Sequence, residues 1–200
     1  MHLVYMITDL LSSCVVSVPA VYAAVRIWDR TPSGKKLLLA GLLTVYLSEV
    51  YLIVGLPGIM YIHWDPAVNL IPLRDFGDAR YLFQTGMNAL MFVPLGILLP
   101  LLWPHYRHLP QLAAAGVLTS GMIELLQLFC FRATDIDDLL MNTLGAVIGF
   151  LLVLWWSRRQ SEAGGKDAAE FWCINLLIVA TTIFIRPLVA DLIYSLPCFS

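Results

Sequence analysis

The sequence predicts an all-α, polytopic membrane protein with about six transmembrane helices and an outward-facing polar recess. Hydrophobic residues make up 60% of the 200 residues and charged residues only 13%, which is too little polar surface for a soluble domain. The mean hydropathy is +0.80. Apolar runs of roughly the 20 residues that cross a bilayer recur along the chain between short polar breaks. We therefore predict one membrane domain over residues 1–200.

Each predicted span is an apolar run bounded by charged or Pro/Gly-rich residues. The six runs are Leu3–Val25, Leu37–Val54, Met87–Trp103, Leu112–Phe129, Leu139–Trp156 and Phe171–Tyr194. The first is interpreted as a retained helix rather than a signal peptide, because it lacks a basic leading end, contains Asp9 and exceeds a usual h-region. The second is short unless it continues to about Tyr61. The sixth contains Asn175, Arg186 and Pro187.

Lys and Arg residues are distributed unevenly between the loops on the two sides of the predicted membrane. One side has Arg26, Arg30, Lys35, Lys36, Arg107, Arg158, Arg159 and Lys166. The other side has Arg74, Arg80 and Arg132. Cytoplasmic loops carry the excess of Lys and Arg, so we expect a multi-pass protein of the plasma (inner) membrane with both termini outside.

Eight polar residues inside the spans, including all the charged ones, fall in the outer half of the bilayer under this topology. They are Asp9, Glu49, Asn88, Glu124, Gln127, Asn142, Arg186 and Asp191. Each has a simpler explanation by itself, such as a hydrogen bond between helices or a pair between Arg186 and Asp191. Independent roles do not predict that all of them share one side, so the pattern favours a common polar recess.

The fifth span begins with a cluster of acids. Asp135, Asp138 and Asn142 are three and four residues apart, which puts them along one helix face. Either Asp135 or Asp137 is expected to cap the helix N-terminus, but capping does not account for all three acids.

Small residues and a buried acid constrain the packing of the neighbouring spans. Gly145, Ala146 and Gly149 form a stripe that predicts close packing of the fifth span against the fourth or the third. In the fourth span Glu124 and Gln127 share one face. A buried Glu needs a partner, and Arg132 or Arg74 can supply it. The guanidinium group of either arginine could also bind a phosphate or carboxylate through two parallel hydrogen bonds.

Cysteine spacing and net charge exclude further classes. Cys14, Cys130, Cys173 and Cys198 lack CxxC spacing, so no metal or redox motif is expected. A Cys130–Cys198 disulfide is an alternative to lone thiols. The formal net charge of −2 gives no basis for nucleic-acid binding.

Five blocks follow one another between residues 69 and 150. They are Asn69-Leu-Ile-Pro-Leu-Arg74, Asn88-Ala-Leu-Met-Phe-Val-Pro94-Leu-Gly96, Ser120-Gly-Met-Ile-Glu124-Leu-Leu-Gln127, Arg132, and Asp135-Ile-Asp137-Asp138-Leu-Leu-Met-Asn142-Thr-Leu-Gly145-Ala-Val-Ile-Gly149. Together they resemble the VanZ-like family. The resemblance implies a small polytopic membrane protein, and the family's namesake is associated with resistance to the glycopeptide antibiotic teicoplanin. Flanking helices in 1–62 and 171–194 lie outside the resemblance, so Asp9, Glu49 and Arg186 inherit no role from it.

Three classes of function remain open. The first is binding of an anionic lipid or cell-envelope precursor headgroup, such as a polyprenyl phosphate, at the outer leaflet, linked to glycopeptide tolerance. The second is a membrane-embedded hydrolase or transferase in which Glu124, Asp135 or Asp138 acts as base or holds a divalent cation; no other cofactor is expected. The third is a non-enzymatic scaffold of envelope biosynthesis. The candidate ligand-binding residues are Arg74, Asn88, Glu124, Gln127, Arg132, Asp135, Asp137, Asp138 and Asn142.

Overall fold

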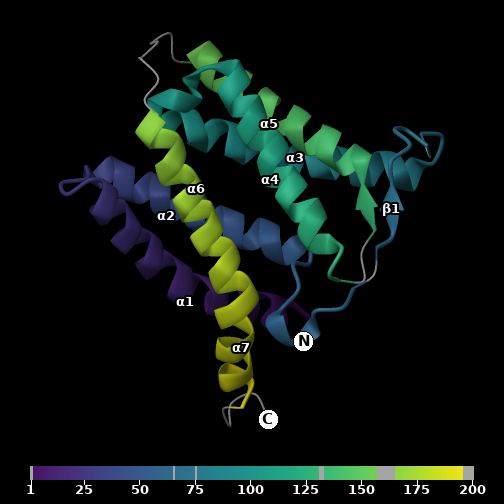
Figure 1. Ribbon diagram of the computed structural model, residues 1–200, viewed down its shortest axis with the longest axis horizontal. Coiled ribbons are helices and arrows are strands. Elements are labelled where there is room, and N and C mark those ends of the chain that lie inside the picture. The colour runs from purple at the N-terminus through teal and green to yellow at the C-terminus, as the bar shows by residue number, and fades with distance from the viewer. Residues whose placement is uncertain (1, 65, 75, 131–132, 157–164, 196–200) are drawn as a thin grey trace. The chain divides into compact units, whose positions relative to one another are not determined.

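The computed structural model describes residues 2–64, 66–74, 76–130, 133–156 and 165–195. Six helices dominate the described chain (Figure 1): α1 (His2–Trp28), α2 (Gly34–Ile53), α3 (Ala79–Leu102), α4 (Leu109–Gln127), α5 (Ile136–Trp156) and α6 (Gly165–Ala180). The shorter elements are η1 (Ile59–Tyr61), β1 (Val68–Asn69), η2 (Pro104–Arg107), β2 (Thr134–Asp135), the π-helical η3 (Thr181–Ile185) and α7 (Arg186–Tyr194).

The predicted class and number of spans are confirmed. Within the described residues, six helical segments are long and apolar enough to cross a membrane: Ile7–Trp28, Gly34–Ile53, Ala79–Leu102, Leu109–Gln127, Ile136–Leu154 and Lys166–Tyr194. The third helix begins at Ala79 rather than Met87, because the Asp78 side chain caps it by accepting a hydrogen bond from the Arg80 N–H at 2.8 Å. Hydropathy marks the part of a helix that suits the bilayer, whereas the cap marks where the helix begins.

The chain divides into two compact units. The flanking unit takes in Met1–Ile62 and Ala169–Ser200, and the core unit takes in His63–Ala168. In the flanking unit, α1 packs against α2 and against η3 and α7. In the core unit, α5 packs against both α3 and α4. The single membrane domain expected from the sequence stays a prediction.

Helices α3 and α5 of the core unit approach each other through glycine residues. A Cβ atom at Gly145 would lie 1.9 Å from the Ala89 carbonyl oxygen, and one at Gly96 would lie 1.9 Å from the Ala146 carbonyl oxygen. No side chain fits at such distances, so glycine is required for this backbone contact. The predicted stripe of small residues is therefore a packing surface, and its closest partner is the third span.

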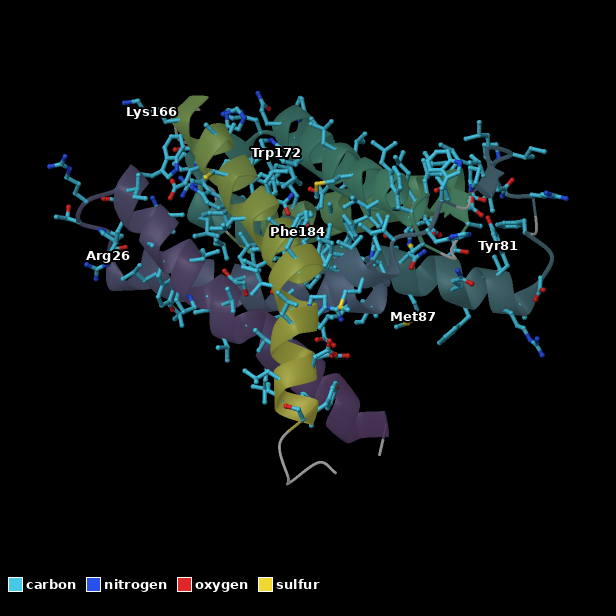
Figure 2. All side chains as sticks on the ribbon, turned by 60° about the horizontal axis from the view of Figure 1, so that its bottom comes forward. Arg26, Tyr81, Met87, Lys166, Trp172 and Phe184 are labelled. Carbon is cyan, nitrogen blue, oxygen red and sulfur yellow. The ribbon has the colours of Figure 1, made fainter. Side chains whose placement is uncertain are left out.

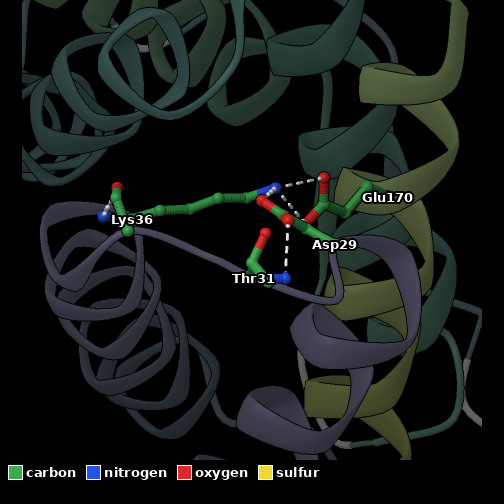
Figure 3. A network of polar contacts seen from close by, with 5 residues as sticks. Asp29, Thr31, Lys36 and Glu170 are labelled. Atoms are coloured by element: carbon green, nitrogen blue, oxygen red, sulfur yellow. Dashed lines mark hydrogen bonds and ion pairs between the residues drawn. The ribbon is translucent and has the colours of Figure 1, made fainter.

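In the flanking unit an ion pair joins the α1–α2 turn to α6 (Figure 3). Lys36 Nζ lies 3.0 Å from Glu170 Oε1 and 3.6 Å from Asp29 Oδ2. Asp29 Oδ1 in turn accepts a hydrogen bond from the Thr31 N–H at 3.1 Å. Glu170 is buried, and a buried carboxylate is costly without a counter-charge, so Lys36 stabilises the start of α6 against this turn.

Large apolar side chains are exposed on the helices. Met87 of α3, labelled in Figure 2, is 47% exposed, and Phe184 of η3 is 50% exposed. Soluble proteins seldom expose apolar surface on this scale, whereas hydrocarbon surroundings favour it. The exposed surface thus agrees with a multi-pass membrane protein.

Candidate functional site

A short parallel bridge holds two distant segments of the core unit together. β1 pairs with β2 so that Val68 faces Thr134 and Asn69 faces Asp135. The Thr134 N–H donates a hydrogen bond to the Ala67 carbonyl at 2.8 Å. The bridge fastens the loop before α3 to the connection between α4 and α5. The acids at the start of α5 thereby lie next to residues far earlier in the chain: Asp135 and its partner Asn69 are 66 positions apart.

Glu124 is a buried carboxylate near the end of α4, with 5% of its surface exposed. Its Oε2 atom accepts a hydrogen bond from the Asp135 N–H at 2.9 Å, and its carbonyl accepts one from the Thr134 hydroxyl at 2.9 Å. Arg74, one of its two predicted partners, is exposed and forms no ion pair within the described part of the chain. The other, Arg132, lies outside the described residues. A backbone amide therefore takes the place expected for Arg74.

Asp135 is the N-cap of α5. Its Oδ1 atom accepts a hydrogen bond from the Asp137 N–H at 2.9 Å, which satisfies an amide at the start of the helix. Its Oδ2 atom accepts one from the Asn69 side-chain amide at 3.0 Å. The prediction that Asp135 or Asp137 caps this helix is confirmed, and Asp135 is the residue that does so.

Asp137 fastens the loop before α3 to α5. Both of its carboxylate oxygens accept from the Leu73 N–H at 3.0 Å, and Oδ2 also accepts from the Tyr81 hydroxyl. Leu73 has a φ of 57°, in the left-handed region that is unfavourable for a residue with a branched side chain. The buried carboxylate thus holds a strained turn in place.

Two further side chains of α5 reach neighbouring helices. Asn88 Nδ2 on α3 donates to Asp138 Oδ1 at 2.5 Å, and Asn142 Nδ2 donates to Ser120 Oγ on α4 at 2.9 Å. Asn142 is buried, and its Oδ1 atom has no hydrogen-bond partner among the described residues. The predicted face from Asp138 to Asn142 therefore lies at the junction of α3, α4 and α5.

An apolar groove of about 470 Å³ lies beside this network, between α4 and α5. It is lined by Leu70, Val117, Leu118, Gly121, Met122, Glu124, Leu125, Thr134, Asp135, Ile136 and Leu139. The ionisable residues of the lining, Glu124 and Asp135, lie where α4 ends and α5 begins. The surface of the groove is almost wholly apolar, and Glu124, Thr134 and Asp135 border one end of it, so its lining suits the apolar part of an amphiphile.

The predicted metal and catalytic candidates are engaged with protein donors. Glu124, Asp135 and Asp138 each accept a hydrogen bond described above. Among the described residues, no group of three or more His, Cys, Asp and Glu side chains is arranged to hold a metal ion. Their catalytic and metal-binding roles stay predictions.

Gln127, the remaining candidate on α4, is also buried. Its carbonyl accepts a hydrogen bond from the Cys130 thiol at 3.3 Å. Cys198, the other half of the disulfide considered from the sequence, lies outside the described residues.

Several residues of the network were not predicted as site residues. Asn69, Leu73 and Ser120 lie within the blocks that resemble the VanZ-like family, and that resemblance is the signal that could have found them. Thr134 and Tyr81 lie outside those blocks, and no local pattern marks the contact of Tyr81 with Asp137 more than fifty positions away.

The flanking unit contains a separate polar pocket of about 140 Å³. It is lined by Asp9, Glu49, Leu52, Ile53 and Arg186. The pair considered between Arg186 and Asp191 does not form among the described residues; the Arg186 Nε–H instead donates to the Thr182 carbonyl at 3.3 Å. The polar residues thus form one group in each unit, and their union in one recess stays a prediction.

Comparison with known proteins identifies relatives of the chain. The family model described as VanZ/LLP1 matches residues 18–157. Protein VanZ of Enterococcus faecium is 32% identical over 151 residues, which cover 72% of this chain and 91% of that protein. No solved structure matches the chain. The family match extends beyond the block at 69–150 and includes Glu49, whereas Asp9 and Arg186 lie outside it.

Proposed function

Because the chain belongs to the VanZ/LLP1 family, we propose that it binds an amphiphilic lipid or envelope precursor at the outer leaflet of the plasma membrane. The apolar part of the ligand lies in the groove between α4 and α5, and its headgroup lies against Glu124. Binding of this precursor contributes to tolerance of glycopeptide antibiotics, the role that the resemblance implies.

The groove is the observation that carries this proposal. Its volume of about 470 Å³ is within the range of small-molecule sites, and its lining is almost wholly apolar, with Glu124, Thr134 and Asp135 bordering one end. Glu124 Oε2 is occupied by the Asp135 N–H, whereas Oε1 accepts no hydrogen bond from the described residues. A buried carboxylate oxygen beside a groove suits a ligand that donates a hydrogen bond, such as a hydroxyl or an amide N–H.

The abundance of acids is compatible with an anionic headgroup. Asp135, Asp137 and Asp138 accept hydrogen bonds from the protein's own donors, which leaves Glu124 as the carboxylate that faces the ligand. Arg74 is exposed on the loop that also supplies Leu70 to the groove, and its guanidinium suits a phosphate. An envelope precursor could present its phosphate to Arg74 and a hydroxyl or amide donor to Glu124. Arg132 is a further candidate, from the sequence, for binding the phosphate.

The test is native mass spectrometry of the purified protein, which detects lipids that remain bound. Gly121→Leu fills the groove, and a Cβ atom at this position would meet Leu139 at an ordinary 3.7 Å. Glu124→Gln removes the charge and keeps the acceptor for the Asp135 N–H. Gly86→Leu on α3 is the matched control, because nothing lies within 4 Å of a Cβ atom there.

We expect a phosphate-containing lipid on the wild type and on Gly86→Leu. The bound fraction should fall about tenfold in both remaining variants. Glu124→Gln loses one charge-assisted hydrogen bond to the lipid, and Gly121→Leu loses a comparable free energy of packing between the lipid and the groove. The same lipid occupancy in all four folded proteins would contradict the proposed function.

A further inference from the structure

We propose that the loop before α3 inserts a set of apolar side chains into the boundary between the headgroups and the acyl chains of the bilayer. The five side chains are those of Trp64, Leu70, Ile71, Leu73 and Phe76, and together they are called the apolar loop surface. Figure 1 shows this loop beside β1, at the end of the core unit where α3 and α5 begin. The partner of the surface is the lipid bilayer itself, whatever ligand the groove between α4 and α5 binds.

The five side chains are large, apolar and exposed. Their exposed fractions range from 54% for Leu73 to 69% for Leu70. All five lie outside the membrane-spanning helices, since α2 ends at Ile53 and α3 begins at Ala79. The bilayer contact of the spans therefore does not account for them. In water a cluster of this kind would be costly, because its apolar surface would stay hydrated.

Hydrogen bonds attach the backbone of the loop to the core unit. Asn69 pairs with Asp135 in the strand bridge, and the Leu73 N–H donates to the Asp137 carboxylate at 3.0 Å. Within the loop, the Ile71 N–H donates to the Asn69 side-chain oxygen at 3.2 Å. These polar backbone groups bind the protein, whereas the apolar side chains remain on its surface. The loop is thus held in one conformation that presents them together.

Trp64 lies at one edge of the apolar loop surface, against residues that follow α4. The centroid of its ring is 5.2 Å from that of Phe129, and both side chains are exposed. The neighbouring His63 N–H donates to the Phe129 carbonyl at 3.0 Å. Trp is enriched at membrane–water interfaces because its ring is apolar while its N–H needs a polar partner. An exposed aromatic pair just beyond the end of a spanning helix is therefore typical of an interfacial belt.

Leu73 gives a second indication that the surface has a partner. Its φ of 57° is a conformation that glycine adopts at lower cost. The chain nevertheless has a large apolar side chain at this position, and more than half of that side chain is exposed. Packing against the described residues therefore returns little for the strain. Contact with acyl chains supplies the apolar surroundings that the protein does not.

The connection to α3 limits how deep the surface can lie. Phe76 is three residues before Ala79, where the spanning helix begins, so it lies within about 10 Å of that point. Apart from the two residues of β1, the described backbone of the loop forms turns and irregular structure. Irregular backbone is not tolerated where it faces hydrocarbon. The backbone therefore belongs at the level of the headgroups, and only the side chains insert.

Charge and continuity select a lipid surface as the partner. Residues 63–80 contain two Arg and three Asp, so the loop has no excess of positive charge that would require anionic lipid. Its apolar area drives insertion, and a zwitterionic bilayer suffices. The early turns of α3 continue the apolar exposure through Leu82 and Phe83, which belong to a spanning helix. One bilayer contacts both surfaces, and no protein partner is needed.

Leu70 belongs both to the apolar loop surface and to the lining of the groove between α4 and α5. One wall of the groove thus lies at the level of the inserted side chains. Under the proposed function, an amphiphile can pass from the leaflet into the groove without crossing water. This route rests on the proposed function, whereas the insertion of the loop does not.

The test is fluorescence quenching of a bimane label on single cysteines, in a background without native cysteines. Ile71→Cys carries the label on the apolar loop surface. Gly34→Cys is the control, because the residue is exposed, nothing lies within 4 Å of a Cβ atom there, and its neighbours Ser33 and Lys35 are polar. The proteins are placed in phosphatidylcholine nanodiscs, which leave both faces accessible to iodide. Nitroxide lipids with the spin label near the headgroup or in the middle of the acyl chain quench from the bilayer.

We expect iodide to quench the label at Ile71→Cys several-fold less than the label at Gly34→Cys. The nitroxide near the headgroup should quench Ile71→Cys more strongly than the one in mid-chain, as insertion at the boundary requires. Replacing part of the phosphatidylcholine with phosphatidylglycerol should change neither result, because the loop lacks excess positive charge. Phe76→Cys gives a second position on the same surface and should behave like Ile71→Cys.

Three outcomes would overturn the proposal. Equal iodide quenching at the loop positions and at Gly34→Cys would place the loop in water. Protection from iodide without quenching by either nitroxide lipid would mean that protein, such as a second copy of the chain, covers the surface. Stronger quenching from mid-chain would mean that the backbone enters the hydrocarbon. Gly121→Leu fills the groove and should leave the quenching pattern unchanged, so a failure of the proposed function is distinguished from a failure of loop insertion.

Discussion

At the scale of single residues, hydrogen bonds divide the acids of the core unit into two kinds. The oxygens of Asp135 and Asp137 accept from amides and a hydroxyl of the protein itself. Glu124 also accepts one amide and, like Asp135, lines the groove, but it keeps an oxygen that no described residue occupies. The donors around these carboxylates thus differ. Under the proposed function, the aspartates serve the fold and Glu124 serves the ligand.

Asp135 gives a test of this division. Asn is as good an N-cap as Asp, so Asp135→Asn should retain the cap, whereas Asp135→Ala should lose about 1 kcal/mol of unfolding free energy. Unfolding in mixed micelles measures the stability of both variants, and native mass spectrometry measures their bound lipid. We expect Asp135→Asn to keep its lipid. A stable Asp135→Asn protein that has lost it would show that the negative charge of Asp135 contacts the ligand.

At the scale of helices, the contact between α3 and α5 depends on glycine residues of both. In addition to Gly96 and Gly145, a Cβ atom at Gly149 would lie 2.1 Å from the Val93 carbonyl oxygen. The two backbones are therefore in contact over more than one turn of α5. Membrane helices have no hydrophobic force between them, so close packing of this kind is a main source of their association.

Gly145→Ala should destabilise the protein, because its methyl group would overlap the Ala89 carbonyl and force the helices apart. Overpacking of this kind costs about 1–3 kcal/mol. The measurement is the unfolding free energy in mixed micelles. Gly86→Ala lies on the same pair of helices but has open space around its Cβ atom. Its unfolding free energy should equal that of the wild type or be slightly higher. Equal stability of the two variants would mean that α3 and α5 separate at little cost.

The sequence predicted helices better than it predicted the contacts between loops. Hydropathy located all six spans because bilayer thickness imposes one length on every crossing segment. The Gly145 stripe and the Asp135 cap were predictable because both depend on residues a few positions apart. The partners of Asp137 were not, since Leu73 lies in the loop before α3 and Tyr81 lies in α3 itself, and no local rule encodes that pairing. The backbone amide that replaced Arg74 at Glu124 was missed for the same reason.

At the scale of the whole molecule, charge distribution predicts the orientation in the membrane. Basic residues such as Lys35 and Lys36 concentrate in the loops on one side, and the connection that contains Ala133 lies on the other. Outer-leaflet action depends on this orientation. With the opposite orientation, the proposed ligand would have to be a lipid of the cytoplasmic leaflet.

Single cysteines in a background without native cysteines test the orientation in intact cells. Ala133→Cys should react with a membrane-impermeant maleimide, because the residue is exposed and expected outside. Gly34→Cys, exposed at the start of α2, should react only after the cells are opened. The reverse labelling pattern would place both termini in the cytoplasm and contradict binding at the outer leaflet.

The bridge between β1 and β2 also sets an order of events during synthesis. Val68 and Asn69 leave the ribosome well before their partners Thr134 and Asp135, and α3 and α4 are made in between. The loop before α3 therefore lacks its strand partner and its contact with Asp137 while α3 and α4 are inserted into the membrane. Only when α5 emerges do the strand, the cap and the strained Leu73 turn form together. Assembly of this end of the groove accordingly requires the start of α5 and cannot be completed before it is made.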